Sequence, residues 1–111
     1  MRFEVETLPN FEREARRLRK KFISLPSDLL HLIEQLETDP FIGTALRGGF
    51  YKIRLAIKSK GKGKRGGARV ITYVKVVKNK VFLVSIYDKS EQSDISDDEL
   101  NRLLLEIPNK Q

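Results

Sequence analysis

The sequence predicts an α+β domain with the element order β-α-α-β-β-β-α. Apolar residues recur at helical spacing in the first third of the chain. Polar and apolar residues then alternate over 51–58, and β-branched and aromatic residues dominate 69–87. A length of 111 residues fits a single domain spanning 1–111. We therefore expect a helical hairpin packed on a mostly antiparallel sheet, with the helices on one face.

The first elements are a short strand and two helices. Residues 2–7 alternate polar and apolar, which is typical of a half-buried strand. The first helix follows Pro9, and its apolar residues form one stripe: Phe11, Ala15, Leu18 and Phe22. We expect 24–26 to break this helix and Ser27 to cap the second one, which ends at 38–40.

The remaining elements are three strands and a helix. The segment 41–49 is expected to be a loop, followed by strands at 51–58, 69–77 and 80–87, with a tight turn at Asn79. The last of these strands is apolar on both faces, which places it centrally in the sheet. Ser96 and Glu99 form a capping box that begins a C-terminal helix.

Composition excludes several functional classes. The chain has no cysteine, which excludes disulfides, thiol catalysis and thiolate metal sites. The single histidine, His31, has no acidic or histidine partner at metal-ligand spacing, so we expect no metal and no cofactor. Ser85 lacks a histidine partner and is expected to lie in the core. No signal peptide or membrane-spanning stretch is present, so we expect no membrane contact and a cytoplasmic location.

The net charge of +7 is concentrated in one segment. Residues 47–69 contain nine basic residues and no acidic one, whereas the flanking segments are near-neutral or acidic. Such a block favours a polyanionic partner, most often nucleic acid. The alternative is a solvated basic loop. The glycine-rich part at 61–67 is not a P-loop, because no Ser or Thr follows Lys64 and a strand comes next.

Five residues make a candidate catalytic site. Lys52 and Arg54 lie two positions apart and therefore project from the same strand face. Arg69 begins the next strand, and Tyr87 and Lys89 end the last one. Cations around a phenol suit cleavage of RNA by its own 2′-OH. A lysine crowded by cations gives up its proton more readily, so Lys52 is a candidate base. The alternative is a solvated basic sheet face.

Five further cations lie at the end of the strand predicted over 51–58 and in the long loop that follows it. They are Lys58, Lys60, Lys62, Lys64 and Arg65. Because the loop is rich in glycine, we expect these residues to contribute affinity for RNA or the ribosome through counterion release, more than precise chemistry.

Three segments of the chain together resemble the RelE/ParE toxin superfamily. They are 51–55 (YKIRL), 61–73 (GKGKRGGARVITY) and 84–91 (VSIYDKSE). The long basic loop is most similar to the HigB-like branch. The resemblance implies a RelE-like microbial ribonuclease fold. It also implies a bacterial type II toxin that cleaves mRNA in the ribosomal A site without a metal, leaves a 2′,3′-cyclic phosphate and is silenced by a cognate antitoxin.

The resemblance also implies roles for individual residues. Lys52 and Arg54 match the paired basic residues assigned to base and phosphate roles, and Arg69 matches the arginine that stabilises the phosphorane. Lys89 lies near a further family cation. Ser96 stands where some members have a C-terminal tyrosine, so Tyr87 is the candidate substitute.

Three functions remain open from the sequence. The first is a ribosome-dependent endoribonuclease (an mRNA interferase) with ribosome and mRNA as partners and an antitoxin of helix-turn-helix type. The second is a ParE-like toxin directed at gyrase, and the third is a non-catalytic RNA- or ribosome-binding module. The full set of cations favours the first, because ParE-like members tend to lack it.

Overall fold

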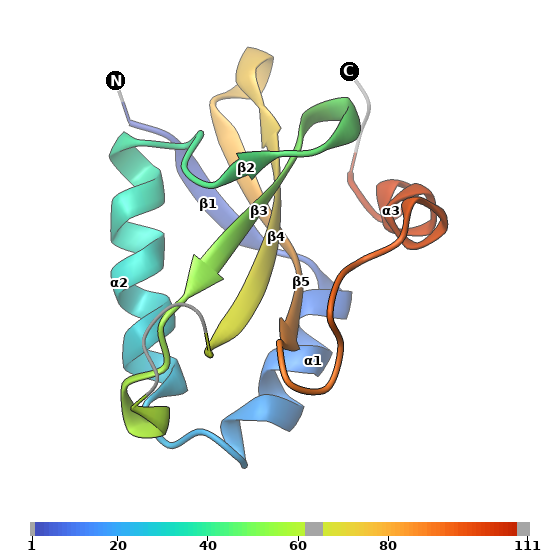
Figure 1. Cartoon of the computed structure of the whole chain (residues 1–111). Helices are drawn as coiled ribbons and strands as arrows, with labels where there is room; N and C mark the ends of the chain where they lie inside the picture. The colour runs from blue at the N-terminus through green and yellow to red at the C-terminus, as the bar shows by residue number, and fades with distance from the viewer. Residues whose placement is uncertain (1, 62–65, 109–111) are drawn as a thin grey trace.

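The computed structural model describes residues 2–61 and 66–108 and shows a five-stranded sheet with helices on both faces (Figure 1). The elements are β1 (Glu4–Thr7), α1 (Pro9–Arg19), α2 (Leu25–Thr38), β2 (Thr44–Ala45), β3 (Phe50–Leu55), β4 (Ala68–Lys75), β5 (Lys80–Asp88) and α3 (Asp97–Leu104). Short 3-10 turns lie at Arg47–Gly49, Lys58–Lys60 and Val76–Lys78. The predicted α+β class is confirmed, and the element order is confirmed apart from β2.

The strands are arranged in the order β1-β5-β4-β3-β2. β1 pairs with β5 in parallel, and every other neighbouring pair is antiparallel. The predicted loop at 41–49 contains the two-residue strand β2, whose residues are both exposed. Such a strand buries no side chain, so the sequence has no hydrophobic pattern there to reveal it.

The hairpin of α1 and α2 covers one face of the sheet. The apolar stripe of α1 packs with Leu32 and Leu36 of α2 onto Ile53, Val70 and Leu83 of the sheet. The expected alternation of β3 is confirmed, since Ile53 and Leu55 are buried on this side whereas Arg54 is exposed.

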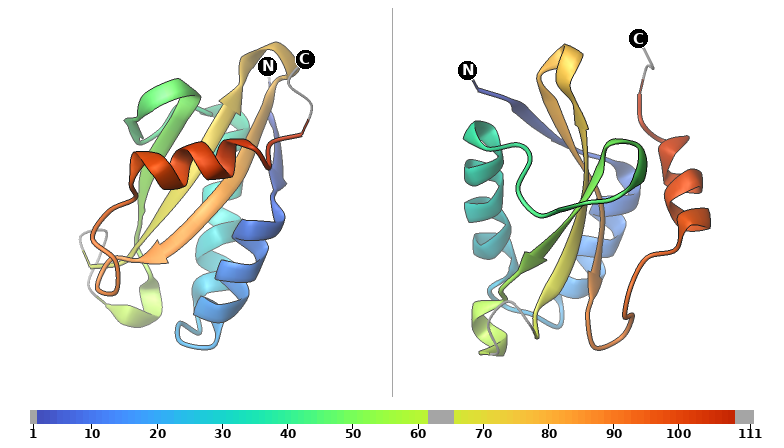
Figure 2. Two further views of the ribbon diagram at one scale, coloured as in Figure 1. Left: turned by 90° about the vertical axis from the view of Figure 1, so that its right-hand side faces the viewer. Right: turned by 45° about the horizontal axis from the view of Figure 1, so that its top comes forward.

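α3 lies on the opposite face of the sheet, which corrects the expectation that all helices share one face (Figure 2). Leu100 and Leu103 pack there with Phe82 and Val84 of β5. β5 is apolar on both faces, so each face requires its own cover to exclude water. The amphipathic pattern of a short helix gives its apolar side but does not say which face of the sheet receives it.

Two predicted helix starts have different outcomes. The capping box is confirmed, since Ser96 Oγ accepts a hydrogen bond from the backbone N–H of Glu99 at 3.1 Å. α2 begins at Leu25, not after Ser27 as expected, and Pro26 lies in its first turn, where its missing N–H costs nothing. Asp28 is instead buried and accepts hydrogen bonds from Ser24 Oγ and the backbone N–H of Lys58.

Within the described residues, no helix has the length and apolar character needed to cross a membrane. The longest helix, α2, has 14 residues.

The close approach of Gly67 to β3 yields a stability prediction. A Cβ at Gly67 would lie 2.1 Å from the carbonyl oxygen of Leu55. We expect Gly67→Ala to lower the free energy of unfolding by about 3 kcal/mol, because the backbone of one strand would have to move. Denaturant unfolding measures this change. Gly61→Ala is the control, since nothing lies within 4 Å of the added carbon and only the positive φ of 71° is strained. It should cost about 1 kcal/mol, and equal losses would contradict the steric argument.

Candidate active site

Strand register brings the predicted catalytic residues into one row. Arg54 of β3 lies opposite Arg69 of β4, and Arg69 lies opposite Tyr87 of β5. Residues paired across neighbouring strands project from the same face, so two guanidinium groups and a phenol are neighbours there. Lys52 projects from the same face two positions earlier on β3. This is the face that α3 covers in part.

Arg69 is more buried than a residue at the rim of a sheet. Only 5% of its surface is exposed, and its Nη1 donates a hydrogen bond to the carbonyl oxygen of Ala68 at 3.2 Å. A guanidinium at this depth has fixed geometry and is poorly screened by water, which increases its effect on a nearby anion. The burial also gives Arg69 a part in the packing of the fold.

Lys52 is paired with a carboxylate, Asp94, that the sequence analysis did not single out. The distance from Lys52 Nζ to Asp94 Oδ1 is 3.0 Å. A hydrogen bond from the backbone N–H of Ile95 and the contact with Lys52 lower the pKa of Asp94. The ammonium of Lys52 therefore already has an anionic partner in the free chain. The role of Lys52 as a base stays a prediction.

The hydroxyl of Tyr87 is buried and makes no hydrogen bond to any described residue. Burial raises the pKa of Tyr87 to about 12, with a further rise from the charge of Asp94 and an opposing effect of Arg69. A buried hydroxyl without a partner lowers stability, so its presence at a cationic face calls for an explanation. At this pKa the phenol stays protonated at neutral pH and can serve as a proton donor.

Lys89 lies half-buried just after β5, and its backbone N–H donates to the carbonyl oxygen of Gly67 at 3.2 Å. Its positive charge contributes to the lowered pKa of Asp94, so it lies near the Lys52–Asp94 pair. The structure therefore brings all five predicted catalytic residues to one region, with Asp94 added.

Among the loop cations, Lys60 is held in the structure and is not a free surface charge. Its Nζ lies 3.1 Å from Oδ1 of the fully buried Asp88 and 5.1 Å from the ring centre of Phe22. Lys21 of the turn after α1 binds the other oxygen of Asp88 at 2.7 Å. Lys60 thus shares the carboxylate of Asp88 with Lys21, and its contribution to RNA affinity stays a prediction.

The other loop cations have different outcomes. Lys58 is exposed and remains available to a polyanion. Lys62, Lys64 and Arg65 lie outside the described residues. His31 is exposed, with Nδ1 3.0 Å from the carbonyl oxygen of Ser27, and Ser85 is buried with Oγ bonded to Glu14. The described residues contain no group of three or more His, Asp or Glu side chains that could hold a metal ion.

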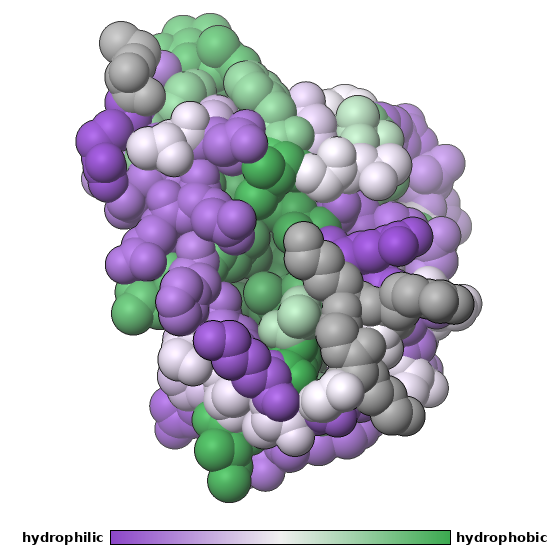
Figure 3. Space-filling model, turned by 60° about the vertical axis from the view of Figure 1, so that its left-hand side comes forward, coloured by the Kyte–Doolittle hydropathy of each residue, from purple (hydrophilic) through white to green (hydrophobic). Residues whose placement is uncertain are grey.

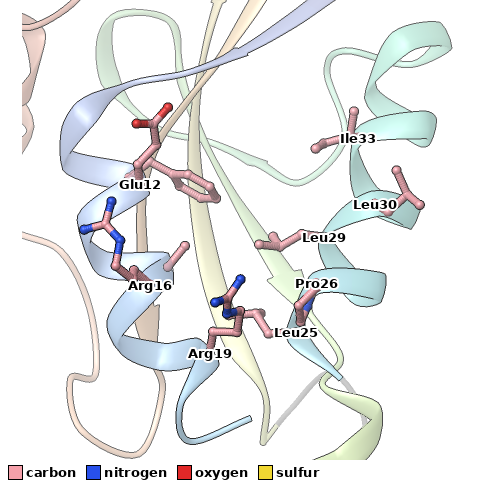
Figure 4. A pocket seen from close by; sticks show the side chains of 10 residues that line it. Glu12, Arg16, Arg19, Leu25, Pro26, Leu29, Leu30 and Ile33 are labelled. Atoms are coloured by element: carbon pink, nitrogen blue, oxygen red, sulfur yellow. The ribbon is translucent and has the colours of Figure 1, made fainter. Parts of the chain in front are cut away.

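A separate groove lies between α1 and α2, away from these residues. It has a volume of about 440 Å³; Arg16, Arg19 and Glu12 of α1 border one side, and Leu29, Leu30 and other apolar residues of α2 border the other (Figure 4). In the view of Figure 3, hydrophobic side chains form a band bordered by hydrophilic ones. Glu12, Arg16 and Arg19 are the charged residues of a lining that is otherwise apolar.

Comparison with solved structures shows which proteins share this fold. A mutant of Escherichia coli toxin RelE in the free state is 22% identical over 84% of this chain and 90% of its own, with a TM-score of 0.59. RelBE2, a toxin–antitoxin complex from Mycobacterium tuberculosis, is 16% identical over 79% and 92%, with a TM-score of 0.58. A metal-bound toxin from Helicobacter pylori is 20% identical over 81% and 98%, with a TM-score of 0.53. The chain therefore shares the fold of these three structures.

The family follows from the sequence match. Residues 9–106 match the family model described as the RelE toxin of the RelE / RelB toxin-antitoxin system. The chain belongs to the RelE toxin family, and the resemblance of its motifs is confirmed at that level.

The Asp88 cluster gives a prediction about pH. Burial raises the pKa of Asp88, but hydrogen bonds from Lys21, Ser90 and Lys60 outweigh it and hold the pKa well below its usual range. The ionised carboxylate therefore stabilises the fold at neutral pH, and this contribution is lost as the pH falls below about 4. We expect Asp88→Asn to cost about 3 kcal/mol at pH 7 and to flatten the acid loss of stability, measured by denaturant unfolding between pH 2 and pH 7.

Glu91→Gln is the matched control for this prediction. Glu91 also binds Lys21, at 3.1 Å, but 42% of its side chain is exposed. Its loss should lower the free energy of unfolding much less than the loss of Asp88, because water screens an exposed ion pair. If the two variants behaved alike, the buried position of Asp88 would not be what gives it its effect.

Proposed function

We propose that this chain is a metal-independent endoribonuclease toxin that cleaves translated mRNA in the ribosomal A site. A cognate antitoxin, of helix-turn-helix type, would neutralise it in the cytoplasm. The observation that carries the proposal is the row of Arg54, Arg69 and Tyr87 with Lys52 on the same face. Family membership supports the antitoxin, and the long basic loop supports the HigB-like branch.

The proposed reaction uses the RNA as its own nucleophile. The 2′-oxygen forms a bond to the adjacent phosphorus, its proton passes to water, and the bond from phosphorus to O5′ breaks to leave a 2′,3′-cyclic phosphate. The phosphorane carries extra negative charge on its non-bridging oxygens. A guanidinium can bond two such oxygens at once, and Arg54 and Arg69 are neighbours across β3 and β4. Electrostatic stabilisation of this kind is the largest contribution that the site offers.

Tyr87 is the proposed proton donor to the departing O5′. Its raised pKa keeps the proton in place at neutral pH, and the phenolate formed would recover a proton from water. Because its hydroxyl is buried in the free chain, RNA reaches it only after nearby groups move. Asp94, 64% exposed and held by Lys52, is the proposed group that RNA displaces.

Lys52 then binds phosphate. An RNA phosphate offers the same negative oxygen ligands as the Asp94 carboxylate and can replace it on Lys52. The exposed cations Arg54 of β3 and Lys58 of the 3-10 turn that follows it extend this phosphate-binding surface. Their contribution should be salt-dependent, as expected for phosphate contacts.

Mapping of mRNA ends after controlled production of the protein tests the proposal. Cuts at a fixed codon position in translated messages, with cyclic phosphate ends, are the expected result. Intact messages together with a DNA-damage response would favour the gyrase-directed toxin. Intact messages on ribosomes that still bind the protein would favour a non-catalytic module.

Arg69→Lys tests the role of the guanidinium. The variant keeps the charge but loses the planar fork, so we expect single-turnover cleavage on programmed ribosomes to fall about 10²-fold. Thermal unfolding should be recorded alongside, because Arg69 is buried. Lys78→Ala removes an exposed cation at the far end of the β4–β5 hairpin and should leave the rate unchanged. An equal effect of both changes would reduce Arg69 to one charge among many.

Tyr87→Phe separates catalysis from stability. Removing an unpartnered buried hydroxyl should leave stability unchanged or raise it by about 1 kcal/mol. Single-turnover cleavage should nevertheless fall about 10²-fold, as for loss of a general acid. Tyr73→Phe, on the same side of the sheet and packed on Phe50, is the control and should cleave normally. Full activity of Tyr87→Phe would exclude the phenol as the acid.

A further inference from the structure

The groove between α1 and α2 combines exposed apolar side chains with two arginines. Leu30 is 56% exposed, and Leu29 and Ile33 are half-buried, so part of the apolar wall of α2 meets water. Arg16 and Arg19 border the opposite wall, on α1. Exposed apolar surface rimmed by polar residues is typical of ligand-binding grooves.

The four arginines of α1 differ in whether they have a partner. Arg13 donates a hydrogen bond to a side chain of the same helix, and Arg17 lies 3.3 Å from Glu91. Neither Arg16 nor Arg19 forms a hydrogen bond or an ion pair with any residue that the structure describes. The two guanidinium groups of α1 without such a partner are thus the two that border the groove.

The charges are unevenly distributed along the groove. Glu12 lies in the first turn of α1, whereas Arg19 lies about two turns further on. Figure 4 shows the guanidinium of Arg19 between the two helices, and the side chains of Leu29 and Ile33 pointing from α2 into the same space. A ligand would therefore place a negative charge at the Arg19 end and an apolar part towards Ile33.

The groove has the size of a small-molecule site. Its volume is about 440 Å³, within the range of roughly 300–1,000 Å³ that is typical of clefts for small ligands. The lining on α1 runs from Phe11 to Arg19. A partner helix of that length, about 10 Å across with its side chains, has roughly twice the volume of the groove and could enter only in part. A small anion with one apolar chain fits the space better.

We propose that the α1–α2 groove binds a medium-chain fatty acid, with its carboxylate on Arg16 and Arg19 and its alkyl chain along the apolar wall of α2. A carboxylate can accept two parallel hydrogen bonds from one guanidinium. The alkyl chain would remove from water the apolar surface that the fold leaves exposed, which favours binding. The proposal does not depend on the ribonuclease activity, because neither arginine belongs to the candidate active site.

Titration with four probes tests the proposal. We would follow the amide and methyl signals of the full chain by NMR while adding decanoate, decanol, acetate or decyltrimethylammonium. Decanoate should saturate one site and shift the signals of Arg19, Leu29 and Ile33, while those of the exposed Val76–Lys78 turn stay unchanged. Decanol lacks the charge and acetate lacks the chain, so each should bind at least about tenfold more weakly. The cationic probe should not bind.

Two matched pairs of variants locate the ligand. Arg19→Gln should weaken decanoate binding about tenfold, whereas Arg17→Gln, on the same helix but paired with Glu91, should leave it unchanged. Leu30→Ser should weaken binding by removing part of the apolar wall, whereas Ile23→Ser, 87% exposed outside the lining, should not. All four substituted side chains are exposed, so each variant should keep the fold.

Three results would overturn the proposal. Binding of many equivalents of decanoate, with shifts spread over the basic surface, would show attraction by net charge alone. Equal affinities for decanoate and decanol would remove the role of the arginines. Shifts caused at the groove by an acidic amphipathic helical peptide, but not by decanoate, would assign the groove to a protein partner.

Discussion

The structure depends on one constraint, which is that β5 must be shielded from water on both faces. Every residue from Val81 to Asp88 is buried. The α1–α2 hairpin shields one face, and α3, joined by a segment without regular structure, reaches the other. Because α3 has only eight residues, its cover is incomplete, and the cationic row lies on the same face. The site is thus located on the sheet face that α3 covers, next to the apolar cluster between α3 and the sheet.

Two cations of this region, one in the site and one in the adjacent loop, are paired with carboxylates in the free chain. Lys52 is bound by Asp94, and Lys60 is bound by Asp88. Of the carboxylates, Asp88 is fully buried and holds structural elements together, whereas Asp94 is exposed on a connecting segment and is easier to displace. A cation paired with an exposed carboxylate avoids the free-energy cost of a partly buried, unpaired charge. It can still bind another anion of the same geometry when that carboxylate leaves. The distinction between permanent and exchangeable ion pairs separates the scaffold from the proposed chemistry.

The sequence predicts the features of this fold that depend on residues close together in the chain. The strand predicted over 51–58 ends at Leu55, but its alternation is confirmed within β3. The double-faced apolar strand and the Ser96 cap are also confirmed. Each of these patterns depends on neighbouring residues. The same register argument placed Lys52 and Arg54 together. The pairing of Lys52 with Asp94, across 42 positions, has no local signal, and neither has the anchoring of Lys60 by a buried carboxylate. β2 was not predicted because both of its residues are exposed and show no alternation of polar and apolar side chains. The face of the sheet on which α3 packs depends on which face the α1–α2 hairpin leaves uncovered.

The parallel pairing of β1 with β5 sets the order in which the molecule can be completed. Glu4 lies beside Lys80 and Thr7 beside Leu83. β1, the first strand to be synthesised, therefore cannot pair until β5 has also left the ribosome. Antiparallel neighbours joined by short turns form earlier than such distant pairs. The α1–α2 hairpin can gather locally, but its apolar face has no sheet to cover until β5 has been synthesised. The cationic row spans β3, β4 and β5, so a nascent chain of this topology cannot assemble it before β5 has been synthesised.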